Sequence, residues 1–270
     1  MTRRPKPDPR LVWTERDEQV ARFTSQQWVT DFSTLQLLCG TERRRTYELI
    51  DRWRDGFGVL RSVSIRPDNA DKDVTVVWPW PAVASERLGY PVSTWNPTST
   101  NLVHKLAVAR VRAALCGLDE TLWVPERTLL RDAAIAAGQR PRGLMGIDRN
   151  GLLPQRGPGI VRAHVHDGRV WHEGRWLAVE VELTLKRPSR KRLAATVFSA
   201  YQRAVNTDAG LLYVYADDTI GDALFRAVNH LIESGRIPER PDIALLSMDT
   251  VLGTRRIDLP ASPTREERAS

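Results

Sequence analysis

Hydrophobic and polar positions in the first part of the chain follow a pattern that predicts short helices. Thr14 is a predicted N-cap, with Asp17 three residues later as its carboxylate partner, and an apolar helical face follows. A second short helix is predicted over residues 32–38, where Asp31 or Ser33 can cap the first turn. Two capped helices are therefore expected before the arginine-rich segment that starts at residue 43.

Thr41 is predicted to cap a third helix that runs to about Asp55. Tyr47, Ile50 and Trp53 recur in it at helical spacing and are expected to face the core. Its other face carries five arginines: Arg43, Arg44, Arg45, Arg52 and Arg54. A helix fits the major groove of DNA, and guanidinium groups on it can pair with guanine or clamp phosphates. The alternative is a solvated face on which these arginines pair with acids of the same helix. Those acids are Glu42, Glu48 and Asp51.

Two strands are predicted after this helix, over residues 59–65 and 74–78. The polar loop between them carries Arg66 and Lys72, which we add to the predicted DNA contacts. Three helices followed by two strands with a charged loop form a winged helix-turn-helix pattern. The sequence therefore predicts a DNA-binding domain over residues 14–88.

The domain organisation beyond this point follows from composition. Residues 89–100 are rich in proline, serine and threonine and are predicted to be a linker. Residues 101–250 are predicted to form an α/β domain, interrupted over 138–160 by an extended loop without periodicity. Residues 1–13 are expected to be a basic disordered arm, and residues 251–270 a disordered tail. The fold class is therefore α/β, or α+β for the whole chain.

Three strands are predicted in succession after residue 159, and helices and strands alternate after them. The predicted strands are 160–165, 169–171, 176–185, 210–216 and 243–247, and the predicted helices are 187–206 and 222–234. The segment 210–216 is continuously apolar, which is typical of the buried centre of a sheet. A mixed sheet covered by helices is expected.

The strand predicted over residues 176–185 carries two acids within an apolar sequence. Side chains alternate between the faces of a strand, so Glu180 and Glu182 share one face. Burying carboxylates without a partner is costly, so they need a cation, an arginine or a metal. Asp167, at the end of the preceding strand, is the third carboxylate, and Lys186 is a candidate cation at the strand's end.

An acid, a glutamate thirteen residues later in an apolar strand and a nearby lysine resemble the PD-(D/E)xK nuclease-like superfamily. The resemblance implies that Asp167, Glu180 and Glu182 bind Mg²⁺ or Mn²⁺, which prefer oxygen ligands. It also implies that Lys186 positions or polarises the attacking water. Glu126, which opens an earlier predicted helix, would be the N-terminal helical acid of such a site.

The chain departs from that pattern in three places. His166 stands where a proline usually precedes the first acid, and Glu182 stands where a lysine is usual. Lys186 has the parity to share the face of the two glutamates, but it lies beyond the expected position. The alternative is that Glu180 and Glu182 form structural ion pairs with arginines after the strand. Those arginines are Arg187, Arg190 and Arg192.

From about residue 14 to residue 247 the chain resembles the replication-relaxation family of actinobacterial plasmids and integrative mobile elements. Besides the winged helix pattern, the resemblance rests on HKLAV at 104–108, WVPER at 123–127 and VEVELTLK at 179–186. The last of these motifs is the most specific. The resemblance implies a role in plasmid replication or transfer, with duplex DNA and the replication or conjugation machinery as partners and a homodimer as a candidate assembly.

Net charge supports a polyanionic partner. The 270 residues include 40 Lys and Arg against 33 Asp and Glu, a formal charge of +7. Basic side chains displace the counterions condensed on nucleic acid, so this balance favours DNA or RNA.

Cysteine usage and hydropathy bear on the compartment. Cys39 and Cys116 each precede a glycine, which predicts buried helix ends, and neither has partners at zinc-ligand spacing. Sparse cysteine fits a reducing cytoplasm. No apolar run approaches the roughly 18 residues that a membrane span needs, and the N-terminus does not resemble a signal peptide. A cytoplasmic protein without a membrane partner is expected.

Three functions are compatible with these patterns. The first is a metal-dependent DNA endonuclease or nickase that uses the three carboxylates and Lys186. The second is a non-catalytic DNA-binding replication or transfer factor, or a regulator, built on a nuclease-like scaffold. The third is a relaxase with a tyrosine nucleophile, for which Tyr201 is the candidate.

Overall fold

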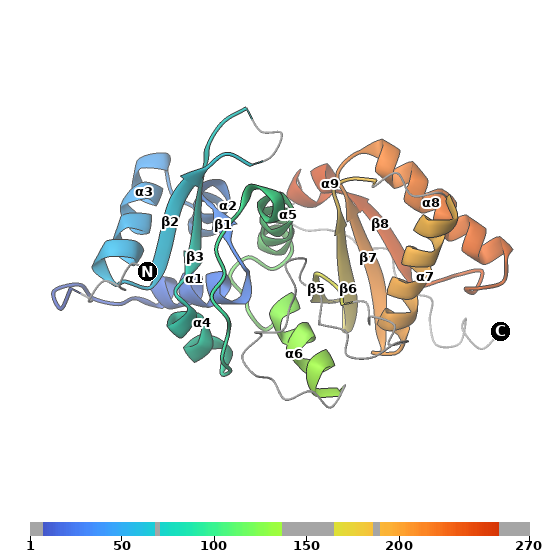
Figure 1. Ribbon diagram of the computed structural model, residues 1–270, viewed down its shortest axis with the longest axis horizontal. Coiled ribbons are helices and arrows are strands. Elements are labelled where there is room, and N and C mark those ends of the chain that lie inside the picture. The colour runs from blue at the N-terminus through green and yellow to red at the C-terminus, as the bar shows by residue number, and fades with distance from the viewer. Residues whose placement is uncertain (1–7, 68–70, 137–164, 186–189, 254–270) are drawn as a thin grey trace. The chain divides into compact units, whose positions relative to one another are not determined.

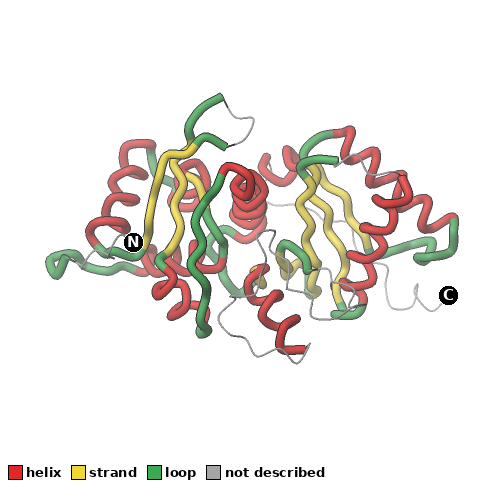
Figure 2. Tube along the Cα trace, in the orientation of Figure 1, coloured by secondary structure: helices red, strands yellow, loops and turns green. Residues whose placement is uncertain are grey.

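The computed structural model describes residues 8–67, 71–136, 165–185 and 190–253 (Figure 1). These residues form helices and two β-sheets (Figure 2). Contacts between residues divide the protein into two compact units. Unit 1 comprises residues 1–120 and 130–162, and unit 2 comprises residues 121–129 and 163–270. No helix within the described ranges is long and apolar enough to cross a membrane.

The described residues of unit 1 place five α-helices and a π-helical turn around an antiparallel sheet. In chain order the elements are α1 (Glu15–Gln26), β1 (Thr30–Asp31), α2 (Phe32–Cys39), α3 (Arg43–Asp51), the π-helical turn η1 (Arg52–Gly56), β2 (Leu60–Ile65), β3 (Val74–Pro79), α4 (Pro81–Leu88) and α5 (Ser99–Cys116). The strand order is β1-β3-β2. Thr30 pairs with Val77, and Leu60 pairs with Pro79. The short strand β1 was not predicted.

Local capping signals explain where the first two helices begin and end. Thr14 and Asp17 form a reciprocal capping box at the start of α1, as predicted. Asp31 caps α2 by accepting a hydrogen bond from the Thr34 backbone N–H at 2.8 Å. Gly40 ends α2 in the left-handed region with φ 59°. Gly117 ends α5 in the same way, with φ 57°, so both cysteines stand at helix ends as predicted, but only Cys116 is buried and Cys39 is half-buried.

The third helix differs from its prediction in two respects. Its N-cap position is Glu42 rather than Thr41, and its α-helical part stops at Asp51 before the turn η1. Ile50 and Trp53 face the core as predicted. Tyr47 does not: its side chain is 38% exposed, and the neighbouring Leu49 is buried instead. The core-facing stripe is therefore rotated from the one that the sequence suggested.

The buried carboxylate of Asp17 connects helix α1 to the turn η1. Asp17 of α1 accepts hydrogen bonds from the Trp53 indole N–H at 2.7 Å and from the Arg52 guanidinium at 3.1 Å. Burial opposes ionisation of Asp17, but hydrogen bonds from Trp53 and Thr14 and the charge of Arg52 outweigh it and lower the pKa of the carboxyl. Because a buried charge must be paired, this network fixes η1 against α1.

Helix α5 belongs to unit 1, although we predicted that the second domain starts at residue 101. The helix begins at Ser99, inside the predicted linker over 89–100. Arg110 of α5 forms an ion pair with the buried Asp31. The guanidinium of Arg112, fully buried, lies 4.3 Å from the Phe23 ring centroid and donates to the Phe23 carbonyl. These contacts are tertiary, so the proline-rich composition gave no sign of them.

Unit 2 is built on a mixed sheet with the order β4-β5-β6-β7-β8. Its elements are β4 (Trp123–Pro125), β5 (Gly168–His172), β6 (Arg175–Glu182), α7 (Arg190–Val205), β7 (Ala209–Tyr215), α8 (Asp218–Glu233), β8 (Ile243–Ser247) and α9 (Met248–Gly253). Strands β4, β5 and β6 are antiparallel, whereas β6, β7 and β8 are parallel. Helix α6 (Glu126–Ala136) crosses the division between the units.

Several predictions for unit 2 can be compared with the described residues. The strands at 169–171, 176–185, 210–216 and 243–247 are present, but β6 ends three residues early, at Glu182. The tail predicted to be disordered from residue 251 begins inside α9, where Val251 is fully buried. The predicted loop 138–160 and all but the last residue of the predicted strand 160–165 lie outside the described residues, and that last residue, Val165, is not in a strand.

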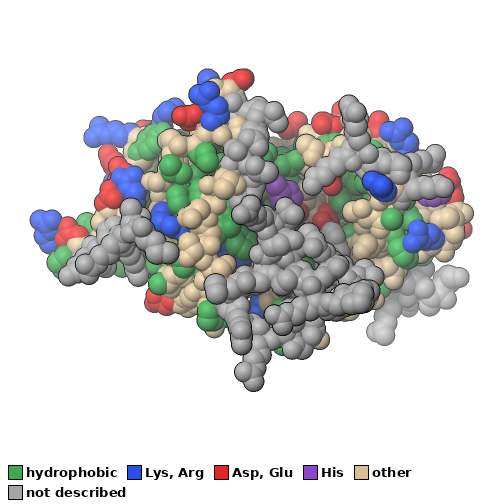
Figure 3. Space-filling model, in the orientation of Figure 1, with side chains coloured by type: hydrophobic (Ala, Val, Ile, Leu, Met, Phe, Trp, Pro, Cys, Tyr) green, Lys and Arg blue, Asp and Glu red, His purple; other side chains and the backbone are tan. Residues whose placement is uncertain are grey.

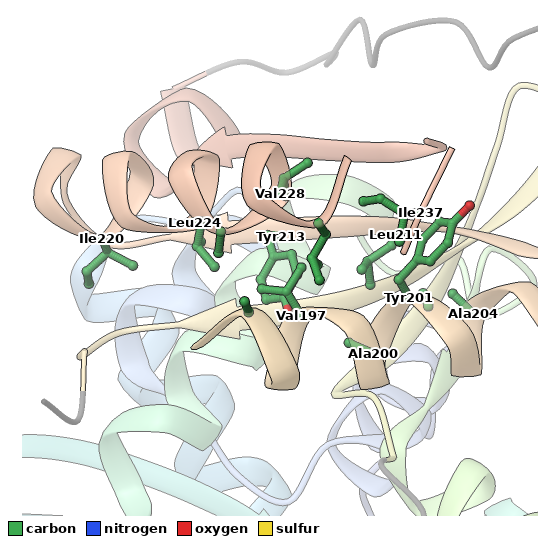
Figure 4. Close-up of a cluster of buried hydrophobic side chains, with 14 residues drawn as sticks. Val197, Ala200, Tyr201, Ala204, Leu211, Tyr213, Ile220, Leu224, Val228 and Ile237 are labelled. Atoms are coloured by element: carbon green, nitrogen blue, oxygen red, sulfur yellow. The ribbon is translucent and has the colours of Figure 1, made fainter. Parts of the chain in front are cut away.

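Helices α7 and α8 pack against one face of the parallel part of this sheet (Figure 1). Figure 4 shows the resulting core, in which Val197 and Ala200 of α7 and Leu224 of α8 surround Tyr213 of β7. Glycine is required at the start of β5, because a Cβ on Gly168 would lie 2.1 Å from the Trp123 ring. The Trp123 ring thus fixes the strand end that carries the predicted acid.

Candidate functional site

The exposed face of α3 carries the first group of predicted site residues. Arg44 and Arg45 point into solvent, with side chains 93% and 55% exposed. Each donates to a different oxygen of Glu48, at 3.1 Å and 2.9 Å. Such exposed ion pairs contribute about 0–1 kcal/mol. The two guanidinium groups can therefore exchange this carboxylate for another anion at little cost.

Arg43 is held differently from its neighbours. Its guanidinium lies 6.0 Å from the Phe32 ring centroid and 5.9 Å from that of Tyr47. The two rings pack against each other with centroids 4.4 Å apart. No carboxylate of the described residues pairs with Arg43. Helical periodicity in the sequence predicted that Tyr47 faces the core, so the contact of its ring with Arg43 was not predicted.

The two arginines of η1 are engaged within unit 1. Arg52, 27% exposed, donates to Asp17 and to the Val12 carbonyl and lies over the Phe57 ring. Arg54 donates to Asp51 and Asp55 and to the Ser62 hydroxyl of β2. Arg52 therefore stabilises the fold, although its position in the sequence suggested a DNA contact.

The hairpin of β2 and β3 supplies the remaining basic residues. Arg66 follows β2 and donates to Asp73 at 3.1 Å, and Lys72 is exposed one residue before that acid. Residues 68–70, between them, lie outside the described residues. Figure 3 shows Lys and Arg side chains (blue) interspersed with acidic ones (red) over this hairpin and α3. Basic groups from α3 and from the hairpin together form the candidate nucleic-acid interface.

The second group of predicted site residues lies in unit 2, in one row across the sheet. Gly168 of β5 pairs with Val179 of β6, so the residues one step further, Asp167 and Glu180, lie side by side. An Asp167 oxygen accepts a hydrogen bond from the Val181 backbone N–H at 2.9 Å. The register of β5 and β6 therefore brings these two acids to neighbouring positions of the sheet.

The same row extends over both neighbouring strands. Pro125 of β4 pairs with Gly168, which brings Glu126, the following residue, to the level of Asp167. On the other side Glu180 pairs in register with Tyr213 of β7, and Glu182 pairs with Tyr215. Burial comes first, and the charges of Glu180, Glu182 and Asp167 add to it in raising the pKa of the Tyr213 phenol well above its ordinary value. The charges of three carboxylates thus disfavour ionisation of one buried hydroxyl.

His166 is the partner of Glu180 that sequence reasoning missed. Its Nδ1 atom lies 2.5 Å from a Glu180 oxygen. Both side chains are largely buried, with 4% of His166 and 14% of Glu180 exposed. The sequence marked His166 only as a departure from the usual proline, because the register that joins β5 to β6 is not visible in it.

The acids of this row are the candidate ligands for a divalent cation. Carboxylate oxygens are suitable ligands for Mg²⁺. However, Glu180 is in contact with His166, and Asp167 accepts a backbone hydrogen bond. Within the described ranges, no three His, Cys, Asp or Glu side chains form a group that could hold a metal ion. Lys186, the predicted water-positioning residue, lies outside the described residues, as does Arg187.

Tyr201, the candidate relaxase nucleophile, lies in the core of unit 2. It is 8% exposed on α7 and packs in the cluster that also holds Ala204 and Leu211 (Figure 4). A nucleophile must reach a DNA phosphate together with an adjacent base or metal. Burial among apolar side chains is a packing role, so the geometry does not favour this third hypothesis.

The surface of unit 1 and the acidic row of unit 2 are thus the two candidate sites of the chain. In comparisons with known proteins, the chain matched no family model, no curated protein and no solved structure.

Proposed function

We propose that this chain binds duplex DNA through unit 1, with α3 in the major groove and the β2–β3 hairpin as a wing. The support is the order of elements: a helix, a short strand, two helices and two strands, with the sheet order β1-β3-β2. This order resembles that of a winged helix-turn-helix, in which the helix after the turn is the reading helix.

The observation that carries the proposal is the exposed basic face of α3. Arg43, Arg44 and Arg45 occupy its first turn and project into solvent. Phosphate oxygens form strong charge-assisted hydrogen bonds with guanidinium groups. Counterion release adds a salt-dependent term for every phosphate contacted. Arg66 and Lys72 extend the basic surface to the wing, where they reach the backbone beside the groove.

Unit 2 is proposed to be a nuclease-like scaffold. The antiparallel β4, β5 and β6, followed by a helix and a parallel β7, give the strand order expected of a PD-(D/E)xK-like sheet. With the resemblance of the sequence to the replication-relaxation family, this favours a replication or transfer factor of a plasmid or mobile element. Duplex DNA, the replication or conjugation machinery and a second copy of the chain are the partners in this proposal.

A second candidate function is Mg²⁺- or Mn²⁺-dependent DNA cleavage by unit 2. One observation favours it: Asp167, Glu180 and Tyr213 share one row of the sheet, with Glu126 at the same level. His166 contacts one oxygen of the Glu180 carboxylate, so a cation would have to bind through the other oxygen or displace His166. Incubating supercoiled plasmid with the protein and either cation, with and without chelator, separates the two candidates.

The experiment for DNA binding is an anisotropy titration with a labelled duplex of random sequence at several salt concentrations. Replacing Arg43, Arg44 and Arg45 together by Ala should weaken binding by at least about tenfold and flatten the salt slope by roughly one per lost phosphate contact. The matched control removes three exposed arginines of unit 2, Arg192, Arg226 and Arg240. Equal losses from both triple variants would contradict a specific role for α3.

A further inference from the structure

The arginines at the start of α3 fall into two classes by what holds them. Arg44 and Arg45 share the carboxylate of Glu48. Arg43, the first residue of the helix, pairs with no carboxylate among the described residues and lies over the Phe32 and Tyr47 rings instead. The three side chains have the same charge, so a purely electrostatic account of binding would not distinguish them.

We infer that Arg43 is the residue of α3 that reads a base edge, whereas Arg44 and Arg45 contact phosphates. This inference rests on the proposed function, because it requires α3 to enter the major groove. The base that Arg43 recognises is guanine, since a guanidinium pairs bidentately with the O6 and N7 atoms of guanine and this pairing is the commonest specific contact. Arg43 is thus a specificity-determining residue.

Position along the helix supports this assignment. The N-terminal residues of a reading helix are those that contact base edges. Arg43 begins α3, and Tyr47 follows one turn later on the same exposed side of the helix. The ring of Tyr47 is 38% exposed, so it can lie against a neighbouring base while it supports Arg43. Apolar contact of this kind suits a thymine methyl group.

The aromatic contacts of Arg43 also affect its side chain differently from the ion pairs of Arg44 and Arg45. An exposed cation–π contact contributes about 0.5–1 kcal/mol and restricts the guanidinium without neutralising it. A planar fork that is already ordered loses less entropy when it forms two hydrogen bonds to a base. Glu48, by contrast, partly neutralises Arg44 and Arg45. Those two arginines are suited to a phosphate, which replaces the carboxylate without regard to sequence.

The test begins with selection from a randomised duplex pool by the full-length protein. The wild-type chain should enrich a motif with one fixed G·C pair. Affinity is then measured for the selected duplex and for the same duplex with that pair replaced. Arg43→Lys should keep most of the affinity for random-sequence duplex and the salt slope, because the charge remains. It should lower the preference for guanine at the fixed position by about tenfold or more, because an ammonium group cannot form the bidentate pair.

Arg44→Ala is the matched control, since it removes an exposed arginine one position away. It should weaken both duplexes equally, reduce the salt slope by roughly one and leave the selected motif unchanged. Tyr47→Leu should lower the guanine preference part of the way, and thermal melting of each variant shows that it is folded. If Arg43→Lys selects the same motif with unchanged discrimination, the inference is wrong. If the wild-type chain binds no duplex, the proposed function itself is wrong.

Discussion

Unit 1 and unit 2 each carry a group of like-charged side chains, but the group is exposed in unit 1 and largely buried in unit 2. The arginines at the start of α3 are exposed, and two of them hold only a surface carboxylate. The acids of unit 2 lie against a buried histidine, a backbone amide and a buried tyrosine. Charge density alone therefore does not distinguish an exposed charged surface from an internal network, whereas burial does.

The physical reason is the cost of removing a charge from water. An exposed guanidinium remains hydrated and can change partners at a cost of about 1 kcal/mol or less. A partly buried carboxylate must be satisfied inside the protein before any ligand arrives. The acids of unit 2 are accordingly occupied by their own chain, whereas the basic face of unit 1 is available to a polyanion. This difference can be tested by variants that have large, intermediate and small effects.

The largest effect is expected from Asp17, an acid of unit 1 that is more deeply buried than those of unit 2. Asp17→Ala removes the acceptor for Trp53 and Arg52 and should lower the free energy of unfolding by about 3–5 kcal/mol. Urea unfolding followed by tryptophan fluorescence measures this loss, with the exposed Glu15→Ala as the control. Because the pKa of Asp17 is lowered in the folded state, its contribution is present above the unfolded pKa and is lost as the pH falls through the folded pKa.

Binding separates Asp17 from the basic face of the same unit. At a temperature where the Asp17→Ala chain is still folded, its affinity for random-sequence duplex should equal that of the wild type. A weakened affinity without unfolding would mean that the buried network also positions α3 for DNA. The distinction between an internal network and a binding surface would then not hold within unit 1.

An intermediate effect is expected from Glu180 in unit 2. Glu180→Ala removes the short contact with His166 and should cost about 2 kcal/mol of stability, the magnitude of a hydrogen bond to a charged group. The loss should be the same with Mg²⁺, with Mn²⁺ and with chelator. Melting curves under the three conditions measure it, and Glu233→Ala, an exposed acid of α8, should change stability by no more than about 0.5 kcal/mol.

Metal binding would be detected in the same melting curves. Ligands that bind only the folded state raise the melting temperature as their concentration increases. If the wild-type chain gains stability with Mg²⁺ or Mn²⁺ and Glu180→Ala does not, the acidic row is a metal site. The second candidate function would then replace the scaffold role of unit 2.

Short-range signals in the sequence predicted the structure well. The capping residue Thr14, the terminating Gly40 and the apolar strand 210–216 all act over a few residues and were predicted correctly. Asp31, which caps α2, was one of the two caps predicted for that helix. The α/β character of the chain followed from them. The two-residue strand β1 was missed because so short a segment has no periodicity to detect.

Long-range features were less accessible. The contact between His166 and Glu180 joins residues 14 apart through the register of two strands, which no local pattern specifies. Helix α5 was assigned to the wrong unit because its partners, Asp31 and Phe23, lie far away in the chain. Tyr47 was assigned to the core because helical periodicity alone did not identify which apolar stripe is buried. Candidate acids could thus be named from the sequence, but not their partners.

A smaller effect is expected from Tyr213 at alkaline pH. Burial and the neighbouring carboxylates raise the pKa of its phenol above the ordinary value of 10.0. The buried protonated form is therefore stable below about pH 10, and stability falls as the pH rises towards the folded pKa, by up to about 1.4 kcal/mol per pH unit from this one group. Tyr213→Phe should reduce that alkaline slope, measured by urea unfolding between pH 9 and 11. Tyr90→Phe, outside the acidic row, is the control; an equal change in both variants would contradict the role of the carboxylates.

The smallest effect concerns the surface pairs of α3 and should increase binding. Glu48→Gln removes the carboxylate that holds Arg44 and Arg45, so both guanidinium groups are more available to phosphate. Because such pairs contribute about 0.2–1 kcal/mol, affinity for random-sequence duplex should rise by roughly two- to fivefold at low salt, and the gain should shrink as salt screens the charges. Anisotropy titrations at two salt concentrations measure the change. The matched control is Glu86→Gln, an exposed acid of α4, which should leave affinity within about twofold of the wild type after the same change in net charge. If Glu48→Gln weakens binding instead, Glu48 itself contacts DNA, for example by accepting from a cytosine amino group. The exposed pairs of unit 1 would then be part of the recognition surface.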